Sequence, residues 1–204
     1  MNHSSLLIVS LLLLGGCTTL PSSHTPQSSD WQQREAQLKQ FSDWQLEGRI
    51  AIHTQDDSWS GSLQWQQLNQ LYDIRFSGPF GQGAMSLTGD AKRVVLSTSE
   101  GDIIGRNGPE QLMLDQLGWR VPISHLQFWV VGRPHPTDVS EKVEFDEYGR
   151  IKRLQQSDWR VDYRRYRHYQ NLELPGKIFI ENHRLSVKLV IDNWQQPEPI
   201  NKNL

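Results

Sequence analysis

The strongest constraint on the fold is a strict alternation of apolar and polar residues in two successive segments. In residues 44–53 the apolar positions hold Trp44, Leu46, Gly48, Ile50 and Ile52, and in residues 58–66 they hold Trp59, Gly61, Leu63 and Trp65. A period of two indicates a β-strand with one buried face. The turn-forming residues 55–57 between the two segments predict that they pair as a hairpin.

The same pattern continues along the chain. Further strands are expected within residues 72–76, 85–87, 94–98, 102–105, 142–145, 150–156, 159–163, 177–180 and 185–191. Two short helices interrupt them, one from Pro109 to a stop at Gly118 and one from residues 122–123 to Gly132. An earlier helix is expected with Asp30 as its N-cap. The pattern predicts a single mainly β domain of about ten or eleven short antiparallel strands.

A sheet with one apolar face must cover that face, by curling on itself or by laying helices against it. A curved sheet with helices on its concave side does both. The candidate interior residues are Trp44, Leu46, Ile50, Ile52, Trp59, Leu63, Trp65, Ile74, Phe76, Trp129 and Trp159. They form either a solid core or the lining of a cavity that the helices close imperfectly, because bulky rings pack with gaps. The sequence leaves both interpretations open.

The N-terminus predicts export. Residues 6–14 are an apolar run too short to span a bilayer but typical of a signal peptide. The run ends in LGGC, which resembles the lipobox of bacterial lipoproteins and predicts cleavage before a lipidated Cys17. A plain secretory signal with a chance cysteine is the alternative. The resulting expectation is a signal peptide at 1–16, a Ser/Thr/Pro-rich tether at 17–29, a folded domain at 30–194 and a polar tail at 195–204.

Composition excludes several classes of protein. Cys17 is the only cysteine, so the fold contains no internal disulfide. The net charge of −2 provides no basic field for nucleic acid, and the mean hydropathy of −0.60 is not that of an integral membrane protein. No common catalytic, metal or phosphate-loop motif is present. The remaining candidates are His53 with Asp56 and Asp57, expected in a solvated turn, and His135, expected in a loop.

Residues 163–169 interleave cations with aromatic rings, as single-stranded nucleic-acid sites do. Export argues against nucleic acid as a partner. A solvated strand edge, or a patch that faces phospholipid head groups or an acidic protein, are the other interpretations.

The stretch SGPFGQG at residues 77–83 places one large ring among turn formers. Its neighbours have almost no side chain with which to bury Phe80, so the ring is expected to project from a tight turn. Folding back onto the rim of the sheet is the alternative.

Several motifs, in this order, resemble the LolB family of outer-membrane lipoprotein receptors. They are W-x-L-x-G-R at 44–49, W-x-G-x-L-x-W at 59–65, G-P-F-G-Q-G at 78–83, L-G-W-R-V-P at 117–122, F-W-V-V-G-R-P at 128–134, Y-G-R at 148–150, S-D-W-R-V-D-Y at 157–163, L-P-G-K-I at 174–178 and K-L-V-I-D-N-W at 188–194. The resemblance covers essentially the whole mature chain. The signal peptide departs from the usual pattern because no Lys or Arg precedes its apolar run.

The resemblance implies an unclosed antiparallel β-barrel covered by an α-helical lid around a hydrophobic cavity. It implies a monomeric receptor, without cofactor, metal or enzymatic activity, that takes acylated lipoproteins from the periplasmic carrier LolA. The cavity would bind their acyl chains, and the protein would insert them into outer-membrane phospholipid. S-diacylglycerol and an N-acyl chain on Cys17 would anchor it at the periplasmic face, and Thr18 agrees with outer-membrane sorting. Residues Gly78, Pro79, Phe80 and Gly81 map onto the family's membrane-insertion loop.

Two other classes of protein are also compatible with the sequence. A structural or scaffold lipoprotein would have a solid core and no lipid cargo. An envelope hydrolase would need a nucleophile within reach of a base.

Overall fold

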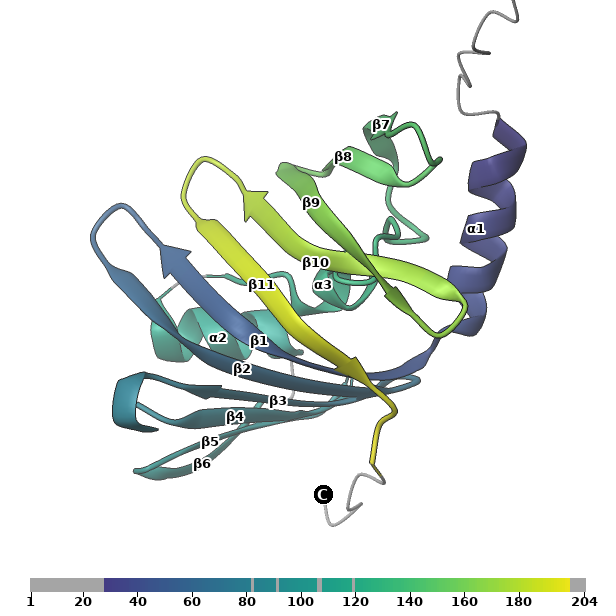
Figure 1. The fold of residues 1–204 in the computed structure, drawn as a ribbon. Helices are drawn as coiled ribbons and strands as arrows, with labels where there is room; N and C mark the ends of the chain where they lie inside the picture. The colour runs from purple at the N-terminus through teal and green to yellow at the C-terminus, as the bar shows by residue number, and fades with distance from the viewer. Residues whose placement is uncertain (1–27, 82, 91, 106–107, 119, 199–204) are drawn as a thin grey trace, which may run out of the picture.

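An antiparallel sheet of eleven strands dominates the computed structural model, which describes residues 28–198 apart from 82, 91, 106–107 and 119 (Figure 1). The strands are β1 Asp43–His53, β2 Ser58–Leu68, β3 Leu71–Ser77, β4 Met85–Gly89, β5 Val94–Thr98, β6 Gly101–Gly105, β7 Ser140–Phe145, β8 Ile151–Gln156, β9 Trp159–Tyr169, β10 Leu172–Glu181 and β11 Ser186–Gln195. The helices are α1 Ser28–Gln40, α2 Pro109–Leu117 and α3 Ile123–Trp129, with a 3-10 turn, η1, at Pro79–Gly81. The predicted fold class is confirmed.

The expected hairpin of β1 and β2 sets the inside and the outside of the sheet. Its register pairs Leu46 with Trp65 and Ile52 with Trp59, so the apolar positions of both strands share one face. Leu46 and Trp65 are buried, whereas Arg49 on the other face is exposed. The alternation in the sequence therefore separates an apolar concave face from a polar convex face.

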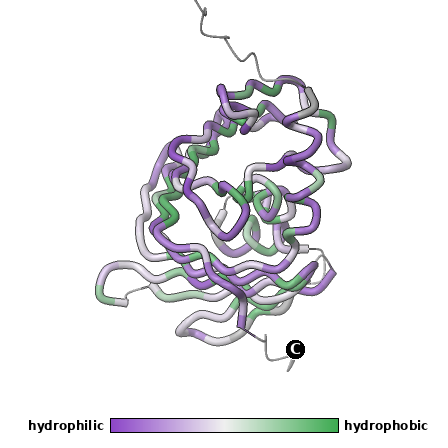
Figure 2. Tube along the Cα trace, turned by 45° about the vertical axis from the view of Figure 1, so that its right-hand side comes forward, coloured by the Kyte–Doolittle hydropathy of each residue, from purple (hydrophilic) through white to green (hydrophobic). Residues whose placement is uncertain are grey.

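The sheet curves but does not close. Its strand order is β6-β5-β4-β3-β2-β1-β11-β10-β9-β8-β7. In the described part of the chain each edge strand has a single partner, β5 for β6 and β8 for β7. Helices α2 and α3 follow β6 and precede β7, so the chain crosses from one edge to the other through them. They lie on the concave side (Figure 1), and Figure 2 shows hydrophobic residues along them inside the curve. The expected α-helical lid is this pair.

One predicted helix end agrees with the structure, and two others differ from it. Gly118 ends α2 in a left-handed conformation (φ 77°), as predicted. Helix α3 ends at Trp129 rather than Gly132, because residues 130–132 form a turn in which Gly132 has φ 82°. Helix α1 begins at Ser28, so Asp30 lies in its first turn and is not the N-cap. Residues 28–29 therefore belong to a helix and not to the tether that their composition predicts.

Helix α1 packs across one end of the sheet. Leu38 is completely buried, Trp31 lies 5.3 Å from Phe145 of β7 and Phe41 lies 6.0 Å from Tyr169 of β9 (ring centroids). Trp31 and Leu38 of the helix, together with Phe41 just after it, join the helix to the domain.

Strand β11 continues to Gln195, one residue into the expected tail. The signal peptide, Cys17 with most of the tether, and residues 199–204 of the tail lie outside the described residues, so those assignments stay predictions. Within residues 28–198, no helix has both the length and the apolar character needed to cross a membrane.

Candidate functional site

A cavity of about 340 Å³ lies between the concave face of the sheet and the helical lid. The sheet contributes Ile50, Ile52, Trp59, Leu63, Trp65, Ile74, Phe76, Met85, Ile180, Val187 and Leu189, and the lid side contributes Met113, Val121, Ile123, Leu126 and Val130. Among the described residues that line it, only Asp57 and Gln116 are polar, and both are exposed. The cavity therefore offers an apolar interior with polar groups where it meets solvent, a size and character suited to an apolar ligand.

Seven of the eleven residues that the sequence suggested for the lining do lie on it: Ile50, Ile52, Trp59, Leu63, Trp65, Ile74 and Phe76. They come from three consecutive strands, β1 to β3, whose alternate residues face the same way. The structure adds lid residues such as Met113 and Leu126, which the motifs did not single out.

The other four candidates, Trp44, Leu46, Trp129 and Trp159, do not line the cavity. Trp44 and Leu46 lie near the start of β1. The centre of the Trp44 ring lies 5.3 Å from that of Trp65 and 5.5 Å from that of Trp194. The ring centres of Trp129 and Trp159 lie 6.2 Å apart. These side chains form solid core beside the cavity, because alternation identifies the inward face but not the position along a strand where the lid leaves space.

The lid is tied to the sheet by buried hydrogen bonds. The Tyr163 hydroxyl donates to the carbonyl oxygen of Trp129 at 3.0 Å, and the Trp129 indole N–H donates to Oε1 of Gln156 at 2.9 Å. Gln156 is fully buried, yet both ends of its amide are satisfied. Burial raises the pKa of Tyr163 well above its usual value, so its hydroxyl stays a donor. The helix α3 is thus fixed at its C-terminal end, while its N-terminal residues line the cavity.

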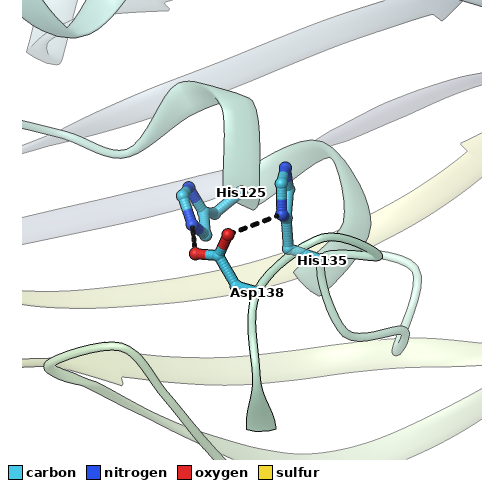
Figure 3. A group of neighbouring side chains, drawn as sticks. All are labelled: His125, His135 and Asp138. Carbon is cyan, nitrogen blue, oxygen red and sulfur yellow. Dashed lines mark hydrogen bonds and ion pairs between the residues drawn. The ribbon is translucent and has the colours of Figure 1, made fainter.

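A second tie joins α3 to the loop that follows it. His125 Nε2 lies 2.7 Å from Asp138 Oδ2, and His135 Nδ1 lies 3.4 Å from Asp138 Oδ1 (Figure 3). The two imidazole rings stack with centroids 4.4 Å apart and an interplanar angle of 24°. The potential ligand atoms of His125, His135 and Asp138 lie within 4.8 Å of one another. However, the lone pair of an imidazole nitrogen lies in the plane of its ring, so two stacked and nearly parallel rings direct their lone pairs in two separate planes. The arrangement holds one carboxylate between two rings and does not point both nitrogens at one ion.

His135 should make the fold sensitive to mild acid. Burial first, and then the neighbouring charge of His125, lower the pKa of His135 in the native state. Below about pH 6.5 the unfolded chain therefore takes up a proton that the native state resists, so the free energy of unfolding falls as the pH drops from there through the lowered native pKa. His135→Gln should lose less stability than wild type between about pH 7.5 and about pH 5.5, measured by urea unfolding.

The matched control is His168→Gln, at an exposed position. This variant should lose as much stability over the same pH range as wild type does. If His135→Gln and wild type show the same pH dependence, His135 does not carry the sensitivity.

The turn between β3 and β4 projects Phe80 into solvent. Gly81 N–H donates to the carbonyl oxygen of Gly78 at 3.0 Å, and Phe80 adopts φ 58° and ψ 23°, a conformation that favours glycine. Its side chain is 102% exposed relative to the reference residue. The alternative in which the ring folds back onto the rim is wrong. A bulky residue held in the left-handed region at a fully exposed position suggests a functional constraint.

The base of this turn is shaped by Gly61 on β2. A Cβ atom at position 61 would lie 2.2 Å from the carbonyl oxygen of Ser77, so the chain can enter the turn only because position 61 has no side chain.

The remaining candidates have local roles. His53, Asp56 and Asp57 are exposed at the β1–β2 turn, where the backbone N–H groups of both aspartates donate to Oγ1 of Thr54. In the segment 163–169, Tyr163 is buried and the Tyr166 hydroxyl donates to the carbonyl oxygen of Ile151 at 2.6 Å. These rings face the interior and offer no stacking platform for bases.

Comparison with known proteins gives the family. The family model "Outer membrane lipoprotein LolB" matches residues 42–194, which include all of the sheet except Gln195 at the end of β11. The chain belongs to the LolB family. Outer-membrane lipoprotein LolB of Nitrosococcus oceani is 38% identical over 193 residues, covering 94% of this chain and 96% of that protein. LolB of Pseudomonas syringae is 39% identical over 189 residues, covering 91% and 92%.

A solved LolA superfamily protein from Nitrosomonas europaea shares the fold at a TM-score of 0.51 and 8% identity, covering 78% of this chain and 87% of that one. Membership in the LolB family makes this chain an outer-membrane lipoprotein of a family that serves lipoprotein localisation.

Proposed function

We propose that this protein accepts acylated lipoproteins from the periplasmic carrier LolA, binds their acyl chains in its cavity and inserts them into the outer membrane. The observation that carries the proposal is the apolar cavity between the concave sheet and the lid. Acyl chains gain roughly 0.8 kcal/mol per buried methylene, so such cargo needs an apolar site at every stage of its transfer. Each tenfold step in affinity requires only about 1.4 kcal/mol, which modest differences in packing between successive sites can supply.

Two further features support the proposal. Lipid on Cys17 would hold the receptor at the periplasmic face of its destination, at a high effective concentration. The Phe80 turn would enter the bilayer surface and open a path for the cargo, since a fully exposed ring is favoured in lipid rather than water. Cargo that passes from weaker to stronger apolar sites needs no other source of energy. We therefore expect a monomer without a cofactor to be sufficient for the transfer.

The direct test is transfer. All described strands and helices lie within residues 28–195, so a chain that starts at Thr18 keeps every one of them and lacks only the anchor. This soluble chain should strip an acylated lipoprotein from its LolA complex, measured by co-purification of the cargo. Failure of transfer by a chain with native circular dichroism would overturn the receptor function.

Filling the cavity should block acyl-chain binding. Met113 of α2 lines the cavity and is 2% exposed, so Met113→Trp places a larger ring in the space that the chain would occupy. We expect the affinity for a fluorescent fatty acid to fall about tenfold or more, equivalent to at least about 1.4 kcal/mol. Overpacking costs about 1–3 kcal/mol of stability, so the folded fraction is measured in parallel.

Val95→Trp makes the same kind of change on β5 away from the cavity lining and should bind normally. A solid-core scaffold lipoprotein is the rival class, and wild type would then bind no fatty acid at all.

An envelope hydrolase has one observation in its favour. Ser124 Oγ lies 3.2 Å from His125 Nδ1, and His125 Nε2 contacts Asp138, which are the residue types of a hydrolase triad. None of the three lines the cavity, and Ser124 is next to His125 in sequence, so the contact is a local one at the start of α3. Ser124→Ala should transfer lipoproteins at the wild-type rate, and loss of transfer in that variant would favour the hydrolase.

A further inference from the structure

A line of residues that includes three cations crosses the convex face of the sheet and ends at the foot of the Phe80 turn. Strand register places its members opposite one another on six neighbouring strands, in the order Arg164, Lys177, Val190, Arg49, Ser62 and Ser77. Ser77 directly precedes Gly78 of the turn. Lys188 lies two residues from Val190 on β11 and therefore on the same face.

Most of the positive charge in this line is not neutralised. Arg49 is paired with Asp192, with Nη2 2.9 Å from Oδ1. Arg164, Lys177 and Lys188 form no ion pair within the described part of the chain, and the Lys177 ammonium lies 5.1 Å from the centre of the Phe179 ring. Further along β9, the acidic Asp162 is already paired with Arg153 and Arg160. The face is therefore cationic, although the whole chain carries a net charge of −2.

A groove connects two of these cations, Arg49 and Lys188, to the exposed ring. It has a volume of about 540 Å³ and lies between the turn and the convex side of β1, β2 and β11. Its lining includes Arg49, Lys188, Ser60, Ser62 and Phe80. Basic groups, hydroxyls and a fully exposed aromatic ring thus share one continuous surface, on the opposite side of the sheet from the cavity.

We propose that this convex face, from β9 to β1, binds the phosphate groups of an anionic bilayer surface and lies against the membrane while Phe80 enters it. The proposal rests on the function proposed for the Phe80 turn and adds the lipid chemistry and the orientation of the domain. Cations beside an apolar side chain are the combination by which interfacial segments bind anionic lipid. In this orientation the cavity, on the concave side, stays accessible to the carrier.

A lipid surface fits this face better than an acidic protein does. A protein partner would bury the cations against its own carboxylates and would leave the ring, which projects beyond the sheet, without an apolar medium. A bilayer provides phosphates and hydrocarbon at successive depths, in the order in which the groove and the ring present their groups.

The test uses the cargo-free chain that starts at Thr18 and sedimentation with vesicles. Vesicles of phosphatidylcholine alone are compared with vesicles of equal parts phosphatidylcholine and phosphatidylglycerol. Lys177→Gln/Lys188→Gln should bind the anionic vesicles roughly 10- to 30-fold more weakly than wild type and the neutral vesicles equally well. Added salt should weaken the binding of wild type to anionic vesicles far more than that of the variant.

Lys92→Gln/Arg93→Gln is the matched control, with the same change in charge at the β4–β5 turn, at the opposite end of the strands from Phe80. It should bind like wild type. Equal binding by the two double variants overturns the proposal, as does a Lys177/Lys188 variant that binds vesicles normally but takes cargo from LolA poorly, which would assign the face to an acidic protein.

Because the assay uses no cargo, its result is separate from that of the receptor function. Failed transfer with salt-sensitive vesicle binding contradicts the receptor and leaves the lipid-binding face. Normal transfer with no preference for anionic vesicles contradicts the face alone.

Discussion

Phe80→Glu should accept lipoproteins from LolA at the wild-type level and deliver them to membranes roughly 10- to 100-fold more slowly. A charged side chain within a bilayer costs about 2.5–3.5 kcal/mol, whereas phenylalanine is favoured there by a few tenths, and part of this difference applies at the interface. Phe80 makes no contribution to the core, since its side chain is fully exposed, so the substitution should not change the fold. The measurement is the amount of lipoprotein in sedimented vesicles against time, with the soluble complex followed in parallel.

Two variants control this experiment. Phe80→Leu keeps an apolar side chain at the tip and should deliver normally. Val139→Glu places the same charge on another strongly exposed apolar residue, outside the turn, and should also deliver normally. Delivery by Phe80→Glu at the wild-type rate would show that the ring is not needed in the bilayer.

Local patterns in the sequence were sufficient for the sheet and for the projecting turn. Alternation over Trp44–Ile52 depends only on which face of a strand is buried. In the structure Trp44, Leu46 and Ile52 are buried and Ile50 lines the cavity. The exposure of Phe80 follows from neighbours too small to cover it, which is also a local property. Gly118 ended its helix where expected for the same reason.

Features that depend on the meeting of distant segments could not be predicted from such patterns. Trp44 and Trp59 both occupy inward positions of neighbouring strands, yet only Trp59 lines the cavity, because the cavity lies at the end of β1 and β2 that holds Trp59. The start of α1 at Ser28 does not follow from the sequence, because the Ser-rich segment before Asp30 has the composition of a tether. No spacing rule connects His125 with Asp138, which only the path of the loop brings together.

Gln156 is the clearest example of a residue whose role depends on segments that are distant in the sequence. In the sequence it follows Gln155 in a polar pair and has no distinguishing feature. In the structure its Oε1 accepts from the Trp129 indole and from the His135 backbone, each at 2.9 Å, and its Nε2 donates at 2.9 Å to the carbonyl oxygens of His135 and Asp138. One side chain therefore fixes the end of α3 and the loop that leads to β7, and with them the side of the cavity that α3 closes.

Gln156→Leu should lower the free energy of unfolding by about 3–5 kcal/mol. The leucine leaves two donors and two acceptors without partners, of which the Trp129 indole N–H is buried and the other three are partly buried. Each buried group left unpaired costs about 1–3 kcal/mol, and less where water can reach it. A domain of this size has a total stability of about 5–15 kcal/mol, so the loss should be plain in urea unfolding. The weakened hold on α3 should also lower the affinity for a fluorescent fatty acid, because Leu126 and Val130 of this segment would no longer be fixed at the cavity wall.

Gln155→Leu is the matched control, because it makes the same chemical change at the next residue of β8, on the opposite face of the sheet. It should stay within about 0.5 kcal/mol of wild type, as surface substitutions usually do. A loss below about 1 kcal/mol for Gln156→Leu would mean that the lid is held mainly by its apolar contacts. In that case the lid could separate from the sheet without breaking these hydrogen bonds, and admission of cargo would depend on the packing of Met113 and Leu126 alone.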